Sequence, residues 1–392
     1  MVARPHQVHA DFGHSGPVRN ANRQRENDHV FSAFCRGRLE MRVLVTGHNG
    51  YIGSVLAPLV RAAGHDVVGL DTFLFEGATF GQNGPEIDSL RMDLRDVQVE
   101  DLRGFDAVMH LAALSNDPLG DVNPQVTFDI NHLGSVRLAR IAKEAGVGRL
   151  IFASSCSLYG VAGEEMLTEE AAFNPITPYG VSKVLFERDV AKLADDDFSP
   201  TFLRNSTAYG VSPRLRADVV VNNLVAIAFT TGEVVIQSDG TPWRPLVHIE
   251  DITRAFLAVL HAPRELVHNE AFNVGRSEEN YRVRDLGELV EQVVPGSKVR
   301  YVEGGGPDPR CYKVDCGKIA CTLPEYQPQW TVRRGMEQLR DAFKANDLTR
   351  EELNGDKYFR IKRIRALQSE GLLDESLRWT SDESPVLAGS GA

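Results

Sequence analysis

The sequence predicts an α/β fold in which a doubly wound parallel sheet is joined to a smaller α/β domain. Three observations lead to this prediction. A strand, a glycine-rich turn and a helix follow one another between residues 41 and 62. Further short β-branched runs then alternate with segments of helical apolar periodicity. Many of the links between them are short, as in parallel sheets whose strands are connected by helices. In such sheets, ligands bind beyond the carboxyl ends of the strands.

The composition and charge narrow the class of protein. With 392 residues and 42% hydrophobic content, the chain can bury one large core or two smaller ones. No apolar run approaches the ~18 residues of a membrane span, and the formal net charge of −11 argues against a nucleic-acid partner. The five cysteines include no C-x-x-C pair, so we expect no metal site and a reduced, cytoplasmic setting.

The two ends of the chain lack the pattern of a folded domain. Residues 1–40 are polar and show no sustained apolar period. We therefore expect a disordered extension there, without a secretory signal because no hydrophobic segment is present. Residues 381–392 are expected to be disordered for the same reason.

The first strand is predicted at Arg42–Thr46, an apolar run that stops at a glycine. Gly47, Gly50 and Gly53 follow at a spacing of three, and helical periodicity begins at Ile52. Glycines let bare backbone amides approach phosphates, and the helix N-terminus adds N–H groups and a partial positive charge. The unit therefore predicts a site for the pyrophosphate of a dinucleotide. Its candidate contacts are Gly47, Asn49, Gly50, Tyr51, Ile52 and Gly53.

A carboxylate at the end of the second strand indicates which dinucleotide binds. The strand Val67–Leu70 ends on Asp71, 18 residues past Gly53. A carboxylate in this position can accept both hydroxyls of the adenosine ribose. It would repel a 2′-phosphate, so the sequence predicts NAD as the cofactor and not NADP.

The next two strand ends carry further candidates for cofactor contacts. Asp93 and Leu94 follow a short third strand. The Asp93 carboxylate can accept from the adenine amino group or cap the helix that follows, and both interpretations stay open. The strand Ala107–Leu111 leads into Ala112 and Ala113, which are small enough to let the cofactor phosphates come close.

A helix is predicted after this strand, with four apolar residues on one face. These are Ile130, Leu133, Leu138 and Ile141. Asn131 lies beside the stripe, where an ordinary polar helix residue is one interpretation.

The residues that point to chemistry come after the following strand, Arg149–Ser154. This strand runs into SSCSLYG, and TPYGVSK follows about twenty residues later. Tyr179 and Lys183 are four apart at a helix start, so both project from one face. A free phenol has a pKa near ~10, and a neighbouring ammonium group stabilises the phenolate. Ser155 can share the proton of a substrate hydroxyl with Tyr179, which predicts oxidation of an alcohol by the bound nicotinamide.

Together these motifs resemble the extended short-chain dehydrogenase/reductases that modify nucleotide sugars, and within them the UDP-galactose 4-epimerase-like enzymes. The resemblance covers roughly residues 41–345. It implies a Rossmann-type sheet, NAD as cofactor and a catalytic trio of Ser155, Tyr179 and Lys183. It also places Asn131 near the nicotinamide. A homodimer is implied through the helices that contain residues 123–146 and 179–194.

The resemblance extends to residues that would bind a nucleotide-diphosphate sugar. Asn222-Asn223-Leu224 resembles an Asn-Leu pair that touches the diphosphate, and Arg244 falls on a phosphate-binding arginine. Arg310 is a second candidate, for which a surface ion pair is the alternative. A planar guanidinium suits a pyrophosphate. The implied substrate residues are Ser115, Ser155, Ser157, Asn205, Asn223, Leu224, Arg244 and Arg310.

Departures from the family pattern bear on the sugar and on the reaction. Thr207 and Pro245 replace the usual Asn and Asp, which leaves the sugar open. The 4,6-dehydratases carry an Asp-Glu pair where this chain has Cys156 and Ser157. We therefore expect no chemistry at C5 and predict a 4-epimerase that acts through a 4-keto sugar. The alternatives are a C4 ketoreductase or dehydrogenase, a dehydratase, and a non-catalytic NAD-binding regulator.

The predicted domain organisation follows from these motifs. Residues 41–205 with 246–275 form the NAD-binding domain, and residues 206–245 with 276–345 bind the nucleotide sugar. A helical extension occupies residues 346–380. It contains a capping box at Thr349–Glu352 and a basic helix at Tyr358–Leu367. This helix either packs on the surface or covers the pocket or a partner subunit.

Overall fold

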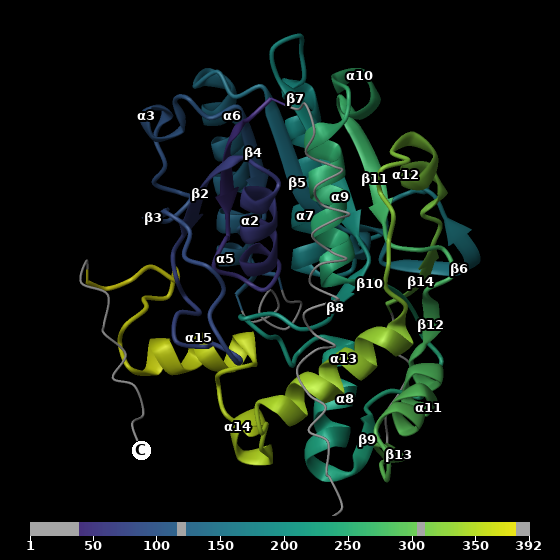
Figure 1. Ribbon diagram of the computed structural model, residues 1–392. Coiled ribbons are helices and arrows are strands. Elements are labelled where there is room, and N and C mark those ends of the chain that lie inside the picture. The colour runs from purple at the N-terminus through teal and green to yellow at the C-terminus, as the bar shows by residue number, and fades with distance from the viewer. Residues whose placement is uncertain (1–38, 116–122, 304–309, 382–392) are drawn as a thin grey trace, which may run out of the picture. The chain divides into compact units, whose positions relative to one another are not determined.

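A parallel sheet of seven strands forms the centre of the described part of the chain (Figure 1). This computed structural model describes residues 39–115, 123–303 and 310–381, so the disorder expected at 1–38 and 382–392 concerns residues outside it. Residues 41–392 form one unit, to which the following description applies. The predicted Rossmann-type α/β class is confirmed.

The strand order in this sheet is β11-β7-β5-β4-β1-β2-β3, and every neighbouring pair is parallel. The strands are β1 (Arg42–Thr46), β2 (Asp66–Asp71), β3 (Ser89–Arg91), β4 (Ala107–His110), β5 (Arg149–Ser155), β7 (Ser199–Asn205) and β11 (Glu270–Val274). The chain builds outward from β1 to β3 and then returns to β4 on the other side of β1. Because the order reverses between β1 and β4, a ligand crevice is expected at their carboxyl ends.

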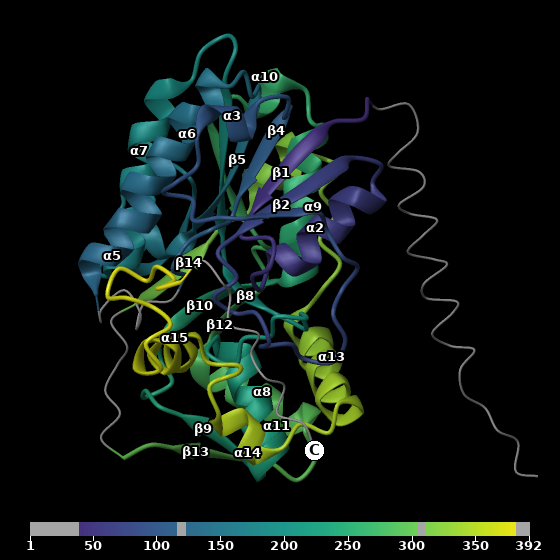
Figure 2. The same cartoon turned by 90° about the vertical axis from the view of Figure 1, so that its left-hand side faces the viewer.

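Helices cover both faces of the sheet, as Figure 2 shows. One layer holds α2 (Gly53–Ala62) and α9 (Ile249–His261), and α10 (Arg264–Val267) follows α9. The other layer holds α3 (Val99–Leu102), α5 (Pro124–Phe128), α6 (Ser135–Glu144) and α7 (Pro178–Val190), which a 3₁₀ turn extends to Leu193. This two-sided cover explains why β1 reads as a continuous apolar run and is buried from Val43 to Thr46.

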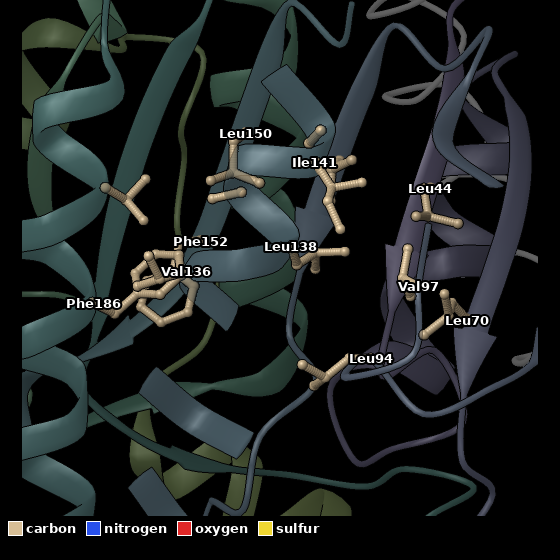
Figure 3. Close-up of a cluster of buried hydrophobic side chains, with 14 of the residues drawn as sticks. Leu44, Leu70, Leu94, Val97, Val136, Leu138, Ile141, Leu150, Phe152 and Phe186 are labelled. Carbon is tan, nitrogen blue, oxygen red and sulfur yellow. The ribbon is translucent and has the colours of Figure 1, made fainter. Parts of the chain in front are cut away.

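The core of this part lies between the sheet and the layer of α6 and α7 (Figure 3). Leu138 and Ile141 of α6 belong to the same buried cluster as Leu150 of β5. Phe152 of β5 stacks on Phe186 of α7 with ring centroids 3.7 Å apart. Burying each such side chain contributes ~1.5–3 kcal/mol, and this fixes α7 against the carboxyl half of β5.

The helix predicted across residues 130–141 is not one regular helix. A π-helical turn, Asp129–Gly134, separates α5 from α6. A π-turn holds more residues per turn than an α-helix, so it rotates the residues before it relative to those after it. Ile130, Leu138 and Ile141 are buried as predicted, but Leu133 is 57% exposed. The prediction for Leu133 was wrong because it assumed an unbroken helical period.

A second group of elements lies beyond the carboxyl ends of the sheet (Figure 1). Its strands are β6 (Val161–Leu167), β8 (Thr207–Tyr209), β9 (Glu233–Ile236), β10 (Trp243–His248), β12 (Asn280–Arg282), β13 (Lys298–Tyr301) and β14 (Cys311–Val314). They form the arrays β12-β10-β8, β13-β9 and β14-β6. The helices of this group are α8 (Val220–Thr231), α11 (Val283–Val293) and α13 (Val332–Ala345), whereas α12 (Gly317–Thr322) lies beside β11 of the large sheet. Within the described ranges, no helix has the length and apolar character needed to cross a bilayer.

The C-terminal extension contains two short helices, α14 (Arg350–Asn354) and α15 (Arg360–Ser369). The predicted N-terminal cap of α14 is present, because Thr349 Oγ1 accepts the Glu352 N–H at 3.1 Å. The predicted basic helix is α15, which begins two residues later than expected.

His248 joins the two groups of elements and gives the fold a predictable dependence on pH. It lies at the end of β10, where its Nδ1 accepts the Glu250 N–H at the start of α9. Its Nε2 therefore carries the proton and donates to Gln338 Oε1 at 2.9 Å. The ring stacks on Trp330 with centroids 3.9 Å apart. Burial lowers the pKa of His248 to about 3.

Acidification is therefore expected to destabilise the protein before its carboxylates titrate. Between pH 6.5 and about 3, the unfolded chain binds a proton at His248 that the folded chain does not, so stability falls as the pH drops through 6.5. This single group accounts for roughly 2 kcal/mol at pH 5 relative to pH 8. Urea unfolding at both pH values should show a smaller difference for His248→Asn than for the native chain. An unchanged difference would contradict the prediction.

Candidate active site

One large cavity lies at the carboxyl ends of β1, β2, β4, β5 and β7, and its volume is about 660 Å³. It opens where the strand order reverses, as expected for this type of sheet. All the site residues predicted from the sequence line it, except Asn49 and Asn131. The structure thus brings together residues as far apart in the sequence as Gly47 and Arg310.

Asn49 and Asn131 instead hold the segments that form the cavity wall. The Asn49 N–H donates to Asp71 Oδ2 at 3.0 Å. Asn131 is buried in the π-helical turn, where its Oδ1 accepts the Leu114 N–H and its Nδ2 donates to the Leu114 carbonyl. That side chain fixes the loop after β4, and its position near a nicotinamide stays a prediction.

The glycine turn after β1 leaves no room for side chains. Gly47 has φ +72°, and a Cβ atom there would lie 2.8 Å from the Ala112 nitrogen. A Cβ on Gly53 would lie 2.1 Å from the Gly47 carbonyl oxygen. The turn can therefore close only with glycine at these positions, and its residues Gly47, Gly50 and Gly53 line the cavity at the start of α2. This cradle fits the pyrophosphate of a dinucleotide.

Two carboxylates lie at the β2 and β3 end of the cavity. Asp71 accepts the N–H groups of Asn49 and Phe73, and burial raises the pKa of Asp71 even though these donors oppose the shift. Asp93 accepts both the backbone N–H and the guanidinium of Arg95. Burial acts to raise the pKa of Asp93, but the Arg95 hydrogen bonds hold it below its usual range. The structure thus gives Asp93 a fixed side-chain partner, while Asp71 is oriented by backbone donors.

Tyr179, Lys183 and Ser155 face the cavity from α7 and β5. Helix α7 begins where the sequence predicts, because Thr177 Oγ1 caps it through the Gly180 N–H and Pro178 occupies its first turn. Lys183 Nζ lies 5.5 Å from the centroid of the Tyr179 ring and donates to the Ala153 carbonyl at 2.8 Å.

The charge on Lys183 depends on its neighbours. Burial lowers the pKa of Lys183 to about 7, and Glu187 one turn later only partly opposes the shift. A negative charge next to the ammonium group favours its protonated form. A phenolate at Tyr179 would therefore favour the charged form of Lys183.

A buried ion pair between α7 and β7 was not found from the sequence. Arg204 Nη2 lies 2.7 Å from Glu187 Oε2, and both side chains are buried. Ser154 Oγ also donates to Glu187 Oε1, so the pair ties α7 to β5 and β7. The spacing of Glu187 four residues after Lys183 is the signal that could have found it.

Ser155 and Ser157 form a small hydroxyl cluster beside Tyr179. Ser155 Oγ accepts the Ser157 N–H and donates to Ser157 Oγ, each at 3.1 Å. Cys156 between them points away, since its Sγ lies 3.1 Å from the Arg204 carbonyl and outside the cavity lining. Burial raises the pKa of Cys156 to about 12, so its thiol stays protonated.

The far part of the cavity is rich in arginines. Arg244 and Arg310 both line it, and Arg244 Nη1 donates to the Arg310 carbonyl. Arg216 and Asp218 also line it and form an ion pair at 2.8 Å, while Arg216 donates to Ser115 Oγ. Sequence reasoning missed this second pair. Two charged residues shortly after the short strand β8 were the available signal.

The described residues include no group of three or more His, Cys, Asp or Glu side chains that could hold a metal ion.

Comparison with known proteins places these features in a family. The profile of the NAD dependent epimerase/dehydratase family matches residues 43–275. A UDP-glucose 4-epimerase from Lactobacillus helveticus is 31% identical over 310 residues, which are 72% of this chain and 91% of that protein.

Two solved structures of relatives have similar folds. The structure of MoeE5 in complex with UDP-glucuronic acid and NAD has a TM-score of 0.68 and 27% identity, covering 78% of this chain and 99% of that one. DesIV, a dTDP-glucose 4,6-dehydratase from Streptomyces venezuelae with NAD and TYD bound, has a TM-score of 0.67 and 26% identity, covering 78% and 98%. Epimerases and dehydratases both occur among the relatives, so family membership alone leaves the reaction open.

Proposed function

The chain belongs to the NAD-dependent epimerase/dehydratase family, and from this premise we propose that it is a nucleotide-sugar 4-epimerase acting through a transient 4-keto sugar. NAD fits the cavity: the glycine cradle accommodates its pyrophosphate and Asp71 its adenosine ribose. When bound, it supplies a hydride acceptor that later returns the hydride.

The residues of α7 and β5 would carry the proton chemistry. Tyr179 takes the proton of the C4 hydroxyl as a phenolate, and Lys183 stabilises that phenolate. Ser155 holds the hydroxyl oxygen through its Oγ. After the keto sugar has turned over, Tyr179 returns the proton to the C4 oxygen, while the hydride would return to the opposite face of C4.

The nature of the groups next to Ser155 carries the choice of epimerisation. A dehydratase or 3,5-epimerase needs a base that removes the C5 proton. Here the two residues after Ser155 are Cys156, whose protonated thiol points away from the cavity, and Ser157, which offers only a hydroxyl. Among the described residues that line the cavity, the carboxylates are Asp71, Asp93 and Asp218. Each already has partners that hold it: backbone amides, Arg95 and Arg216.

Arg244 and Arg310 would bind the diphosphate of the nucleotide sugar. Both line the cavity, and planar guanidinium groups bind phosphate oxygens well. An anchored diphosphate allows the sugar to turn over between the two hydride transfers, which epimerisation requires. We also propose a homodimer through α5, α6 and α7, and a cytoplasmic setting.

A simple experiment tests the proposed reaction. The purified protein is incubated with UDP-, dTDP-, GDP- and ADP-sugars without added cofactor, and products are separated by chromatography. We expect it to retain NAD and to convert one of these sugars into its C4 epimer. In a parallel incubation with added NADH and the corresponding 4-keto sugar, NADH consumption equal to product and no epimerisation without added cofactor would indicate a one-way ketoreductase, and either that result or no turnover would overturn the proposal.

A further inference from the structure

The C-terminal extension, residues 346–380, reaches the cavity described above. Phe359, Arg360 and Leu377 line it together with Asp71 and Phe75, which lie on the adenosine side. The extension also joins the two hydrophobic cores, because Ile364 and Leu377 belong to the core of the large sheet and Tyr358 to the other. Figure 1 shows α15 below the carboxyl ends of β2 and β3.

The extension is attached on both sides of the cavity. At its start, the backbone carbonyl of Tyr358 accepts the Ala217 N–H at 2.9 Å. Near its end, Trp379 Nε1 donates to the Thr72 carbonyl at 2.7 Å, and Arg378 forms an ion pair with Asp96 at 2.5 Å. Both of the last contacts are to loops that follow β2 and β3. The extension therefore spans the adenosine end of the cavity like a strap.

Leu377 shows how this strap is shaped to the cavity. Its backbone is in the left-handed region with φ +59°, which is costly for leucine. Asp374 Oδ1 stabilises the turn by accepting the N–H groups of Ser376 and Arg378. The side chain joins the apolar cluster that includes Leu94 and Leu114, and these residues form an apolar wall of the cavity.

Arg360 is a buried cation without a carboxylate partner. Its side chain is 4% exposed, and its guanidinium stacks on the Phe75 ring at 3.9 Å. Nη2 donates to the Arg214 carbonyl at 2.8 Å, but the buried Nη1 has no hydrogen-bond partner and the described residues offer Arg360 no ion pair. An unpaired buried guanidinium is unfavourable unless an anion binds it.

We propose that the C-terminal extension is a cofactor-retaining strap in which Arg360 binds the pyrophosphate of NAD. Arg360 lines the cavity that holds the glycine cradle and Asp71, and a bound dinucleotide places its phosphates between those two contacts. Nη1 is buried in this structure, and a small rotation of the guanidinium would turn it toward the phosphate oxygens. Phe359 and Leu377 close the groove, so NAD leaves only when the strap loosens.

Binding measurements on the full chain test this role. Arg360→Gln is compared with Arg365→Gln, which removes an exposed charge from the same helix. Calorimetric affinities for NAD, NADP, ADP-ribose, adenosine and UDP are measured on NAD-free protein. For Arg360→Gln we expect roughly 10- to 100-fold weaker binding of NAD and ADP-ribose, faster NAD release and unchanged adenosine affinity. Arg365→Gln should match the native chain.

Other outcomes would overturn the role of Arg360. An equal loss of affinity for adenosine and for NAD, together with a lower unfolding midpoint of the NAD-free protein, would mean that Arg360 only supports the fold. A loss confined to NADP would assign Nη1 to a 2′-phosphate, and a loss confined to UDP would assign it to the substrate. The inference uses the cofactor and not the sugar reaction, so it stands or falls separately from the proposed epimerisation.

Discussion

Replacing Tyr179 with phenylalanine is expected to lower kcat by about 10³-fold with any nucleotide sugar that the protein converts. The ring would keep its packing on α7, but no group would remain to take the proton of the C4 hydroxyl. Ser155 has no ionised form near neutral pH, and Lys183 lies behind the phenol with its Nζ on the Ala153 carbonyl. Steady-state kinetics on Tyr179→Phe, on a control variant and on the native chain measure the change in kcat.

The matched control is Tyr301→Phe, which removes a hydroxyl from a tyrosine that is 47% exposed and outside the cavity lining. Its kcat should equal that of the native chain. NAD content should be unchanged in both variants, since the tyrosine hydroxyl adds little to dinucleotide affinity. A Tyr179→Phe protein with kcat within threefold of the native value would refute the catalytic assignment.

A single methyl group at Gly53 is expected to weaken NAD binding at least ~100-fold. The added Cβ would lie 2.1 Å from the Gly47 carbonyl oxygen, closer than any real contact, so the turn must open. Backbone amides would then move away from the place where we propose that the pyrophosphate binds. Each lost charge-assisted hydrogen bond costs ~1.5–3 kcal/mol, and two lost bonds exceed a hundredfold.

Gly163→Ala is the control for this substitution, because a Cβ there meets nothing within 4 Å. Calorimetry should give native NAD affinity for Gly163→Ala. Circular dichroism and the unfolding midpoint of both variants separate a distorted turn from a lost fold. Native NAD affinity in a folded Gly53→Ala protein would show that the turn is not the phosphate cradle.

Much of the fold could be predicted because parallel strands that are covered on both faces appear as short apolar runs. The strands beginning at Arg42 and Arg149 are examples. Helix α7 was also predictable, since Thr177 and Pro178 mark its start. Helical period alone could not reveal the π-turn before Gly134, so the exposure of Leu133 was missed.

Candidate site residues could be predicted from the sequence where they belong to a local motif. Residues that reach the cavity only because segments distant in the sequence pack together were missed. Tyr179 and Lys183 lie one helical turn apart, so their proximity can be predicted from their spacing in the sequence. The approach of Arg360 and Leu377 to Asp71 depends on how a C-terminal segment packs across the cavity. Nothing in their local sequence carries that information, because burial and partners arise only from tertiary packing.

Hydride transfer at C4 without proton loss at C5 is the central claim, and isotopic labelling tests it most directly. A UDP-sugar carrying deuterium at C4 is converted in H₂O, and the unlabelled sugar is converted in D₂O, both without added NAD. We predict that the first experiment keeps the deuterium at C4 of both epimers and that the second introduces none at C5. Deuterium at C5 from the solvent, or loss of the C4 label, would contradict the account.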